Sequence, residues 1–306
     1  MTHTATLTPI DFTIGSRRLL SVPRRLATWS FSLEQALAGT GVLPAPPEPG
    51  RDGLRVLSAP LSTLPALCER FPAYLIGARQ DYPRHYIAMD ASFADYMARF
   101  SGKTRSTLKR KARKLEAALG DGFAITEHRT PAEIERFLTR AAPLSALTYQ
   151  ARLLDAGLPD GPASSGVFLE LAEQDRMRAF LLEGGKGPIA YLALPVEGAT
   201  LVYAHLGYDP AWSRHSPGTV LQMRALESLF AEERYTHFDF TEGDGAHKAM
   251  FGTDQIACAS FALLSPTLSN RALITARAAF DASIAGAKAL ASRSGALGRI
   301  RSRLRA

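Results

Sequence analysis

The sequence contains little cysteine and no long apolar stretch. Its two cysteines, Cys68 and Cys258, lie far apart, so we expect neither a disulfide framework nor a cysteine-based metal site. No window approaches the ~20 consecutive apolar residues that span a bilayer. The first residues, MTHTATLTPIDFTIGSRR, lack the basic start and apolar core of a signal peptide. These absences predict a reduced, cytoplasmic protein without a metal ion, and peripheral contact with the inner membrane is the alternative.

Acidic residues are missing from two segments, although the chain as a whole carries a net charge of +7. The segment Lys103 to Lys114, KTRSTLKRKARK, is strongly basic and has no acid. Two such clusters predict anionic partners at two places, whereas a solvated helix face is the simpler interpretation of the first. Aromatic residues are not interleaved with these cations, which argues against stacking on single-stranded bases. The second cluster follows Asp281 and consists of Lys288, Arg293, Arg299, Arg301, Arg303 and Arg305.

What is present is ordinary globular composition, with 46% hydrophobic and 21% charged residues, and this predicts a packed core. In the first 90 residues, short apolar runs between turn residues alternate with two helical patterns. The expected strands cover 11–15, 18–23, 53–60, 73–78 and 85–90, and the expected helices cover 30–39 and 62–71.

The rest of the chain mixes helices and strands. Thr130, Pro131 and Glu133 have the spacing of a capping box, so a helix is expected to begin there. Tyr149, Leu153 and Leu154 fall at helical spacing and predict core packing. The other expected helices cover 92–100, 103–119, 167–175 and 268 to at least 291, and the strands cover 123–127, 177–183, 188–196, 200–208, 236–240 and 255–265. In the last helix, Leu273, Phe280, Ile284 and Ala287 form an apolar stripe, which predicts packing on the domain for its first half and membrane contact for its basic end.

The most informative stretch runs from Tyr203 to Phe251 and predicts a strand, a helix opening on Ser216-Pro217-Gly218-Thr219, and a second strand. Ser216 suits the N-cap because its hydroxyl can accept hydrogen bonds from the first turn, and Pro217 suits the first helical position. Gly218 lets another group approach the backbone. The free amides and the positive end of the helix dipole favour an anion. Ser-Pro is also common at helix starts that bind no ligand, so a helix start without an anion is the competing interpretation.

This stretch, YDPAWSRHSPGTVLQMRALES followed by HFDFTEGDGAHKAMFG, resembles acyltransferases of the GNAT superfamily, in the branch of cellulose-biosynthesis-type acetyltransferases. The resemblance covers about Phe93 to Ser265, and His247-Lys248 stands where Tyr-Lys is usual. It implies an α/β (α+β) fold with tandem GNAT-like halves around mixed, largely antiparallel sheets and a C-terminal helix. We therefore expect domains at 1–92, 93–266 and 267–306. The segment Leu144 to Pro159 also resembles bacterial GNAT-type ceramide synthases.

The resemblance implies acyl-CoA as the donor and an amine as the acceptor. The candidate donor-binding residues are Ser216, Gly218, Thr219, Lys248 and Arg105. A backbone N–H of the strand at 202–208 is expected to stabilise the oxyanion.

Proton transfer requires a side chain that titrates near neutrality or a carboxylate whose pKa is raised. The candidates are His205, Glu242, His247 and Asp239, and Tyr208 is the candidate for returning a proton to the thiolate. His205 on an apolar strand could equally be a core residue, and Tyr208 a turn-packing residue. Strand alternation places Asp239 opposite Phe238 and Phe240, so we expect it to face the site or solvent and not the core.

Three functions fit these observations. The first is an N-acyltransferase acting on a lipid or envelope amine such as a sphingoid base, with a polysaccharide or small-molecule acetyltransferase as a variant. The second is an aminoacyl-tRNA-dependent transferase, because the branch resembles the Fem peptidoglycan transferases; tRNA is then the one nucleic acid expected. The third is a non-catalytic GNAT-like domain that binds a partner such as a polysaccharide synthase. An amphipathic tail and a membrane-borne acceptor favour the first.

Overall fold

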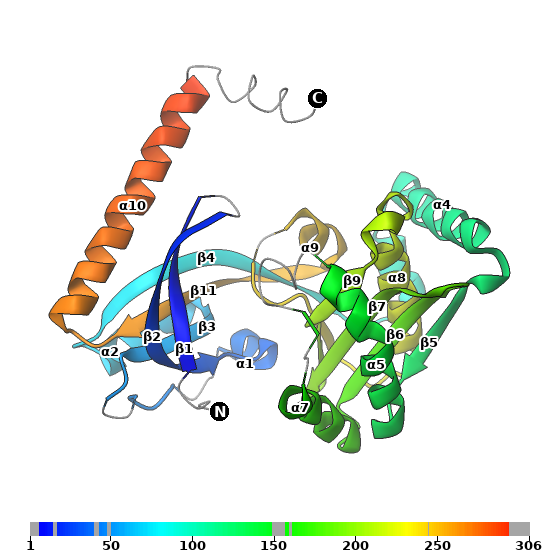
Figure 1. Ribbon diagram of the computed structural model, residues 1–306, viewed down its shortest axis with the longest axis horizontal. Coiled ribbons are helices and arrows are strands. Elements are labelled where there is room, and N and C mark those ends of the chain that lie inside the picture. The colour runs from blue at the N-terminus through cyan, green and yellow to red at the C-terminus, as the bar shows by residue number, and fades with distance from the viewer. Residues whose placement is uncertain are drawn as a thin grey trace. The chain divides into compact units, whose positions relative to one another are not determined.

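A computed structural model describes residues 6–14, 17–39, 43–47, 50–148, 157–158, 161–243 and 245–293. It contains two compact units (Figure 1). The first comprises the described residues up to Pro83 and from Ile256 onward, and the second comprises Arg84–Gln255. None of the helices in the described ranges has the length and apolar character needed to cross a membrane.

The first unit is a sheet with helices packed on it. β1 pairs antiparallel with β2, β2 parallel with β3, and β3 antiparallel with β11. The predicted strands at 73–78 and 85–90 are one strand, β4, which runs through Pro83 and therefore through the boundary between the units. In sheet order the strands are β1 (Thr6–Ile14), β2 (Arg17–Ser30), β3 (Gly53–Pro60), β11 (Asp254–Leu264) and β4 (Leu75–Ala88), and the helices are α1 (Leu33–Ala38), α2 (Leu64–Arg70) and α10 (Leu268–Arg293).

The C-terminal helix α10 packs on this unit through the predicted apolar stripe. Leu273 is buried, and the ring of Phe280 meets that of Phe12 edge-on at 5.4 Å. The guanidinium of Arg277 lies over Phe12 and donates to the carbonyl of Asp11. Core packing is thus confirmed for the first half of the helix. The end of the basic tail lies outside the described residues.

The second unit is a mixed, mostly antiparallel sheet in the order β4-β10-β8-β7-β6-β5, with β9 also paired to β7. Within it, β10 runs parallel to β8 and antiparallel to β4. Its strands are β5 (Ala124–His128), β6 (Met177–Gly184), β7 (Gly187–Glu197), β8 (Thr200–Val202), β9 (His205–Tyr208) and β10 (His237–Asp239). Its helices are α3 (Phe93–Ala98), α4 (Gly102–Leu119), α5 (Pro131–Leu147), α7 (Pro162–Glu173), α8 (Pro217–Ala231) and α9 (Ala246–Phe251), with a 3-10 helix, η3 (Pro210–His215), before α8.

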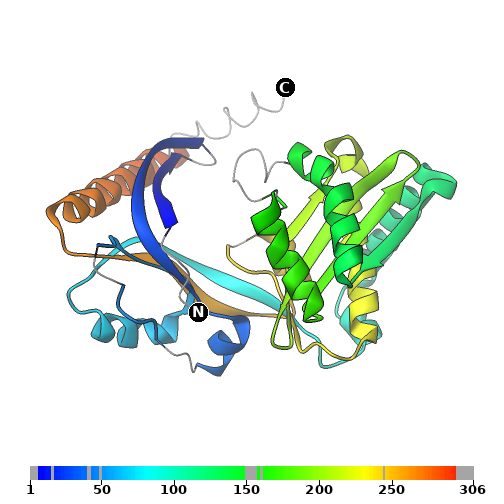
Figure 2. The same ribbon diagram turned by 60° about the horizontal axis from the view of Figure 1, so that its bottom comes forward.

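Helices cover both faces of this sheet, which is why β6 and β7 are apolar on both sides. Helices α5 and α7 pack on the face that carries Met177, Ala179 and Tyr191. Helices α3, α4, α8 and α9 pack on the face that carries Leu182 and Leu192. Figure 2 shows α5 and α7 in green across one face, with the teal α4 and yellow α8 on the other.

Local sequence signals explain most element boundaries. The capping box at Thr130 and Glu133 is present at the start of α5, as predicted. The two helices predicted at 92–100 and 103–119 are present as α3 and α4, and Ser101 starts the second by accepting from the amide of Thr104. The mixed α/β architecture, the largely antiparallel sheet and the C-terminal helix are confirmed. The predicted helical segment around Tyr149, Leu153 and Leu154 lies outside the described residues.

Candidate functional site

Two neighbouring strands separate in the middle of the second unit. The predicted strand 200–208 is in fact two strands, β8 and β9, with a break at Tyr203 and Ala204. β10 follows β8 as far as Asp239, whose carbonyl accepts from the amide of Tyr203. The next amide, Phe240 N–H, donates to His85 of β4 instead. β9 stays paired with β7, so β9 and β10 diverge beyond the break.

The amides of β9 alternate between β7 and this divergent edge. In the antiparallel pair, Asp209 N–H donates to the carbonyl of Ile189, and the register is regular from there to His205. Residues two apart point their amides the same way, so His205, Gly207 and Asp209 face β7. The amides of Leu206 and Tyr208 therefore point to the edge that β10 has left. They are fixed donors, as stabilisation of an oxyanion requires.

Helix α8 begins beside this edge. Pro217 occupies the first turn as predicted. The predicted side-chain cap is wrong: Ser216 lies in the left-handed region with φ 54°, and its hydroxyl makes no capping bond. The amides of Gly218 and Thr219 lie in the first turn, where no intrahelical acceptor exists. The positive end of the helix dipole is thus formed by backbone amides and not neutralised by the serine.

Gly218 is the contact between this helix end and β9. A Cβ atom there would lie 3.0 Å from Cδ2 of Leu206 and 3.3 Å from Cδ1 of Tyr208. The predicted close approach to the Gly218 backbone is therefore made by the chain itself. Pro217 and Gly218 are buried, whereas Ser216 and Thr219 are half-exposed, so Thr219 presents the open side of the turn.

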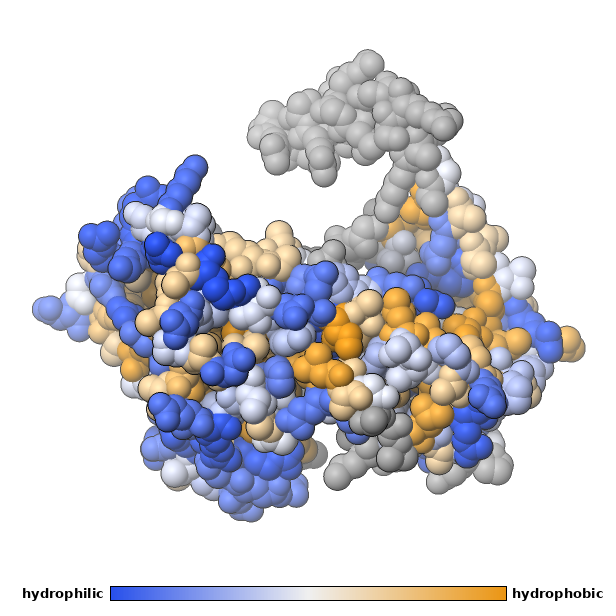
Figure 3. All heavy atoms as spheres, turned by 180° about the vertical axis from the view of Figure 1, so that it is seen from behind, coloured by the Kyte–Doolittle hydropathy of each residue, from blue (hydrophilic) through white to orange (hydrophobic). Residues whose placement is uncertain are grey.

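Thr219 and Arg105, two candidates predicted separately, line the same pocket of about 540 Å³ between α3, α4 and α8. Arg105 is held in place by hydrogen bonds from Nη1 to the carbonyls of Ala98 and Phe100, at 3.0 and 2.7 Å. Part of its guanidinium is thus committed to joining α3 to α4. In Figure 3 the surface over α4, at the upper left, is predominantly hydrophilic.

His247 on α9 is an exposed residue whose ring contacts aromatic rings and a buried amide. Its ring centroid lies 4.7 Å from that of Phe251 and 6.3 Å from that of Phe240, and Nε2 is 2.7 Å from Oε1 of Gln222. Desolvation lowers the pKa of His247, and the positive charges of Lys111 and Lys248 lower it further. The imidazole is therefore neutral at pH 7 and able to accept a proton.

Ring contacts connect His247 to the start of β9. Tyr203, just before β9, packs against Phe240 at 5.4 Å, and Phe240 packs against His247. Burial raises the pKa of Tyr203, so its phenol stays protonated. His247 thus belongs to the same aromatic cluster as the point where β9 and β10 separate.

The other predicted residues divide between the two faces of the sheet. His205 is half-buried against Phe168 of α7, with ring centroids 5.8 Å apart, so it faces the α5 and α7 layer. Tyr208 is 38% exposed on the α8 side. Glu242 is half-buried in the turn before α9, and Lys248 donates to its backbone carbonyl. Lys248 thus makes a bond that orders this turn, and its contact with a phosphate stays a prediction.

Asp239 does not face the site or solvent, and that prediction is wrong. It is 1% exposed and forms a two-pronged ion pair with Arg84, with Nη2 to Oδ2 at 2.5 Å and Nε to Oδ1 at 3.1 Å. Oδ1 also accepts from the amide of Thr241, which has φ 60°. A β-branched residue in this conformation is strained. Asp239 thus holds the turn that carries Glu242 in a strained geometry.

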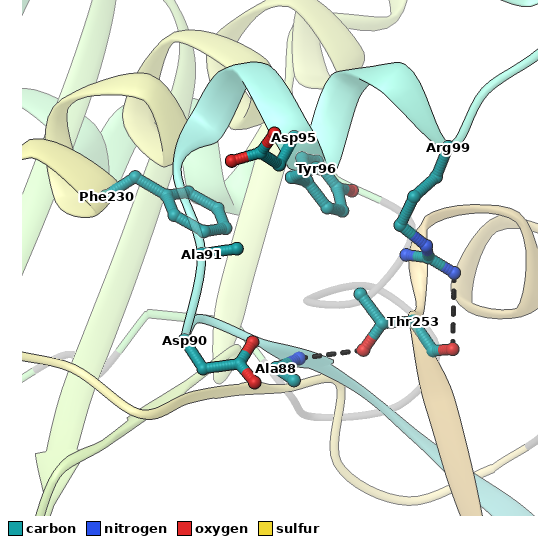
Figure 4. Close-up of a pocket in the computed structure, with 8 residues that line it drawn as sticks. All are labelled: Ala88, Asp90, Ala91, Asp95, Tyr96, Arg99, Phe230 and Thr253. Atoms are coloured by element: carbon teal, nitrogen blue, oxygen red, sulfur yellow. Dashed lines mark hydrogen bonds between the residues drawn. The ribbon is translucent and has the colours of Figure 1, made fainter.

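A second pocket of about 290 Å³ lies beside α3, and Figure 4 shows its lining. Three of its polar side chains, Asp95, Arg99 and Thr253, bond to the surrounding backbone. Asp95 accepts from Ser92 in the capping box of α3, and Arg99 donates to the carbonyl of Thr253 at 3.2 Å. Thr253 Oγ1 in turn accepts from the amide of Ala88. These contacts explain the residues without a ligand.

Sequence reasoning missed Gln222 beside His247 and Arg84 beside Asp239, and it predicted Lys111 only as part of the basic segment Lys103 to Lys114. Gln222 is 0% exposed on the apolar face of α8, and its Nε2 has no hydrogen-bond partner within the described parts of the chain. A side-chain amide among the apolar residues Val220, Leu221, Ala225 and Leu226 is visible in the sequence and indicates a buried polar contact. Arg84 carries no comparable signal, because its partner Asp239 is remote in sequence.

One family model and several solved structures are similar to this chain. Residues 102–249 match the family model of the acetyltransferase (GNAT) domain. The crystal structure of FemX is similar over 85% of this chain and 89% of its own, with 11% sequence identity and a TM-score of 0.50.

Two further solved structures are similar. The C-terminal domain (DUF2156) of a putative lysylphosphatidylglycerol synthetase from Agrobacterium fabrum is 11% identical, covering 74% of this chain and 72% of that one, with a TM-score of 0.49. L-PGS from Bacillus licheniformis is 14% identical with the same coverage and a TM-score of 0.45. No curated protein matches the chain. The predicted GNAT-like fold is confirmed by the family model, and the structural likenesses concern the fold alone.

Proposed function

We propose that this acyltransferase, whose residues 102–249 match the model of the acetyltransferase (GNAT) domain, transfers an acyl group from acyl-CoA to the amine of a lipid or cell-envelope component. One observation carries the proposal. Two amides of β9 that point away from β7 face the gap that β10 leaves, beside the amide end of α8. A thioester bound along β9 would meet both sets of donors.

The donor would be held through its pyrophosphate at the start of α8. The amides of Gly218 and Thr219 supply directed hydrogen bonds, and the helix dipole supplies positive potential. Ser216 flanks them in a strained conformation with its hydroxyl uncommitted to a cap. Arg105 and Lys111 in the adjoining pocket add charge. Lys248 lies near enough to Lys111 and His247 to contribute to the same positive field.

The amide of Leu206 would stabilise the oxyanion. It points away from β7 and is fixed by the strand, so it needs no reorganisation as charge develops on the carbonyl oxygen. Removal of one such donor in acyl-transfer enzymes costs about 3 kcal/mol of barrier. The packing of Leu206 against Gly218 keeps this amide in register with the end of α8.

His247 is the proposed base. Its lowered pKa keeps the ring neutral, and donation of Nε2–H to Gln222 leaves Nδ1 to take up the proton of the amine. The nitrogen forms a bond to the acyl carbon, the carbon–sulfur bond breaks, and the thiolate receives a proton from Tyr208 or water. Glu242 would bind and orient the ammonium form of the acceptor. His205 on the opposite face would line the path of the acceptor.

A long-chain amine such as a sphingoid base is the acceptor we favour. Support comes from the likeness of Leu144 to Pro159 to ceramide synthases and from the basic tail, which suits an anionic membrane surface. A polysaccharide or small-molecule amine is the variant with a smaller acyl group.

A Fem-like transferase that uses aminoacyl-tRNA is the second candidate. The observation that favours it is the exposed basic surface of α4, where Lys103, Arg110 and Lys114 have no acidic partner among the described residues. Phosphate backbones bind such surfaces without regard to sequence.

The test measures CoA release by the purified chain from acyl-CoAs of several lengths, with and without a long-chain amine. We expect amine-dependent release that His247→Ala reduces at least about 100-fold, as loss of a general base does. His237→Ala, at the other end of β10, is the control histidine and should retain activity. Turnover only with charged tRNA would support the second candidate. Activity that survives both His247→Ala and Glu242→Ala would exclude His247 as the base and Glu242 as the group that binds the acceptor.

A further inference from the structure

The turn end of the β1–β2 hairpin exposes three large apolar side chains. Ile14, the last residue of β1, is 44% exposed, and Leu19 and Leu20 near the start of β2 are 51% and 56% exposed. The ladder pairs Phe12 with Leu20 and then shifts, so a bulge leaves Leu19 as the extra residue. Single exposed leucines are ordinary, whereas three on the last rungs of one hairpin form a patch. We call Ile14, Leu19 and Leu20 the hairpin tip.

The packed part of the first unit ends before this tip. Ile10 and Phe12 of β1 are buried in a cluster with Leu26 and Leu273. Beyond Phe12 the strand continues to Ile14, about 7 Å farther along the chain. The hairpin tip therefore projects past the core and is available to a partner.

The surroundings of the tip are cationic. The segment from Phe12 to Leu33 contains no acid and four arginines, which are Arg17, Arg18, Arg24 and Arg25. The side chain of Arg18 is 62% exposed, and its contact with Asp11 is long, at 3.9 Å. The other oxygen of Asp11 accepts from the hydroxyl of Ser21 at 2.6 Å. The charge beside the tip thus favours an anionic partner.

Helix α10 runs along the hairpin toward the same end. Near its start, Asn270 accepts from Nε of Arg24 at 2.8 Å, and farther on, the ring of Phe280 meets that of Phe12. Residues after Phe280 continue past the tip, and Lys288 lies about 12 Å farther along the axis. Figure 1 shows the dark-blue hairpin and the C-terminal end of α10 both directed upward. The acid-free end of the chain is therefore directed to the same side as the hairpin tip.

An aliphatic patch bordered by cations fits an anionic lipid surface better than other partners. Lipid chains accept the leucines, and lipid phosphates accept the arginines. A nucleic acid offers phosphates but no apolar phase for the leucines. A second copy of the chain would bring the same cations to the contact and be repelled.

We propose that the hairpin tip docks this chain on an anionic bilayer, with Ile14, Leu19 and Leu20 in the boundary between headgroups and acyl chains. Interfacial segments enter this boundary by about 5–10 Å, which is comparable with the projection of the tip past Phe12. Arg18 keeps its charge at the level of the phosphates while its stem contacts the apolar layer. The proposal goes beyond the proposed function, because it concerns membrane attachment and holds whichever group is transferred.

The first unit also offers a matched control. Leu7 and Leu268 are 68% and 87% exposed in the same unit. Leu7 lies toward the open end of the hairpin, and Leu268 is the first residue of α10, so both are at the end opposite the tip. Leu19→Ser/Leu20→Ser and Leu7→Ser/Leu268→Ser each remove two exposed leucines and no charge. A general loss of surface hydrophobicity would act equally in both, whereas a docking tip would distinguish them.

The experiment sediments the full chain with vesicles of phosphatidylcholine, or of an equimolar mixture with phosphatidylglycerol, at one salt concentration. We expect the wild type to partition onto the mixed vesicles at least about tenfold more strongly than onto phosphatidylcholine. Leu19→Ser/Leu20→Ser should lower the partition coefficient on mixed vesicles at least about tenfold. Leu7→Ser/Leu268→Ser should retain the wild-type value.

A second measurement reports insertion of the tip directly. In Leu19→Trp the added tryptophan should shift its emission to shorter wavelength on mixed vesicles, relative to the wild-type emission. The emission of Leu7→Trp should not shift. This pair decides the question even if thermal unfolding shows that Leu19→Ser/Leu20→Ser is destabilised.

Three results would overturn the proposal: undiminished binding by Leu19→Ser/Leu20→Ser, equal losses in the two serine variants, or an unshifted Leu19→Trp emission. Undiminished binding that requires Arg299, Arg301, Arg303 and Arg305 would assign membrane contact to the tail alone. Self-association without vesicles that Leu19→Ser/Leu20→Ser abolishes would assign the tip to a second copy. Neither measurement requires catalysis, so vesicle binding without acyl transfer would support the docking tip and contradict the proposed function.

Discussion

The Nε2 atom of His247 lies 2.7 Å from Oε1 of Gln222, a side chain that is completely buried on α8. A charged imidazole is disfavoured at this position, because desolvation and two lysines lower the pKa of His247. The amide oxygen accepts a hydrogen bond from Nε2–H and so selects one neutral tautomer. Gln222 is therefore a positioning residue for the proposed base.

Replacing Gln222 tests this relationship. Gln222→Leu should lower kcat about tenfold with little change in the KM of the donor, since the base is misoriented but the donor site is intact. Gln222→Glu should raise the pKa of His247 by placing a carboxylate beside it. The base acts when neutral, so the fall in activity toward acid should begin at a higher pH than in the wild type. The pH–rate profile measures both effects.

An unchanged acid limb in Gln222→Glu would show that His247 is not the group that titrates. Loss of folding would be recognised by circular dichroism, and in that case Lys111→Met provides the second test. Removal of a nearby positive charge should also raise the pKa of His247 and move the acid limb upward, without a new group in the core.

The buried pair of Arg84 and Asp239 should be essential for stability. Asp239→Ala leaves a guanidinium in the core without its carboxylate and should cost about 3–5 kcal/mol of unfolding free energy. Arg84→Met/Asp239→Leu removes both charges and should cost less than the sum of the single variants. Urea unfolding measures the difference. If the costs add, the two side chains do not act as a pair.

This pair also shows where sequence reasoning stops. Alternation correctly separates Asp239 from its two phenylalanine neighbours. The face that carries Asp239 is buried because Asp239 pairs with Arg84, which lies 155 positions earlier in the chain. No local sequence pattern reveals a partner so far away. The split of the predicted strand 200–208 also depends on remote partners, because β7 pairs with both halves whereas β10 pairs with the first half alone.

Signals that are complete within a few residues were predictable. The capping box at Thr130, the proline that starts α8 and the apolar stripe of α10 each depend on near neighbours. Ser216 shows the limit of such signals. Its residue type predicts a side-chain cap, but its left-handed backbone removes the hydroxyl from the amides. The pocket that joins Thr219 to Arg105 depends on helix packing and could not be predicted.

Gly207 should tolerate no side chain. A Cβ atom there would lie 2.5 Å from both Cζ and the hydroxyl oxygen of the buried Tyr191. Tyr191 cannot move freely, because its hydroxyl donates to Ser145 and Ser145 Oγ accepts from the amide of Leu158. Gly207→Ala should therefore cost about 1–3 kcal/mol of unfolding free energy.

Thermal unfolding measures the cost, and the companion variant is Gly207→Ala/Tyr191→Leu, which shortens the opposing side chain. In the Tyr191→Leu background, Gly207→Ala should cost less unfolding free energy than it does in the wild type. Gly185→Ala is the control, since a Cβ atom at that glycine meets nothing within 4 Å. A stable Gly207→Ala protein would mean that β9 and β7 can separate at this point and that Tyr191 does not fix their spacing.

The start of α5 should give stability a dependence on acid pH. Hydrogen bonds from the amides of Thr130 and Arg129 hold the pKa of Glu133 at about 2, well below its ordinary value of 4.5. A depressed pKa contributes stability that is complete above the ordinary value and is lost as the pH falls through the lowered one. Glu133→Gln keeps an oxygen acceptor, as Gln35 does in α1, but removes the negative charge at the helix start, so it should cost about 0.5 kcal/mol at neutral pH, and this cost should shrink as the pH falls from the ordinary pKa to the lowered one. Urea unfolding at several pH values measures it, with the exposed Glu135→Gln as the charge-matched control. A cost that does not change between neutral and acid pH, or one that Glu135→Gln reproduces, would mean that the carboxylate of Glu133 does not stabilise this helix end.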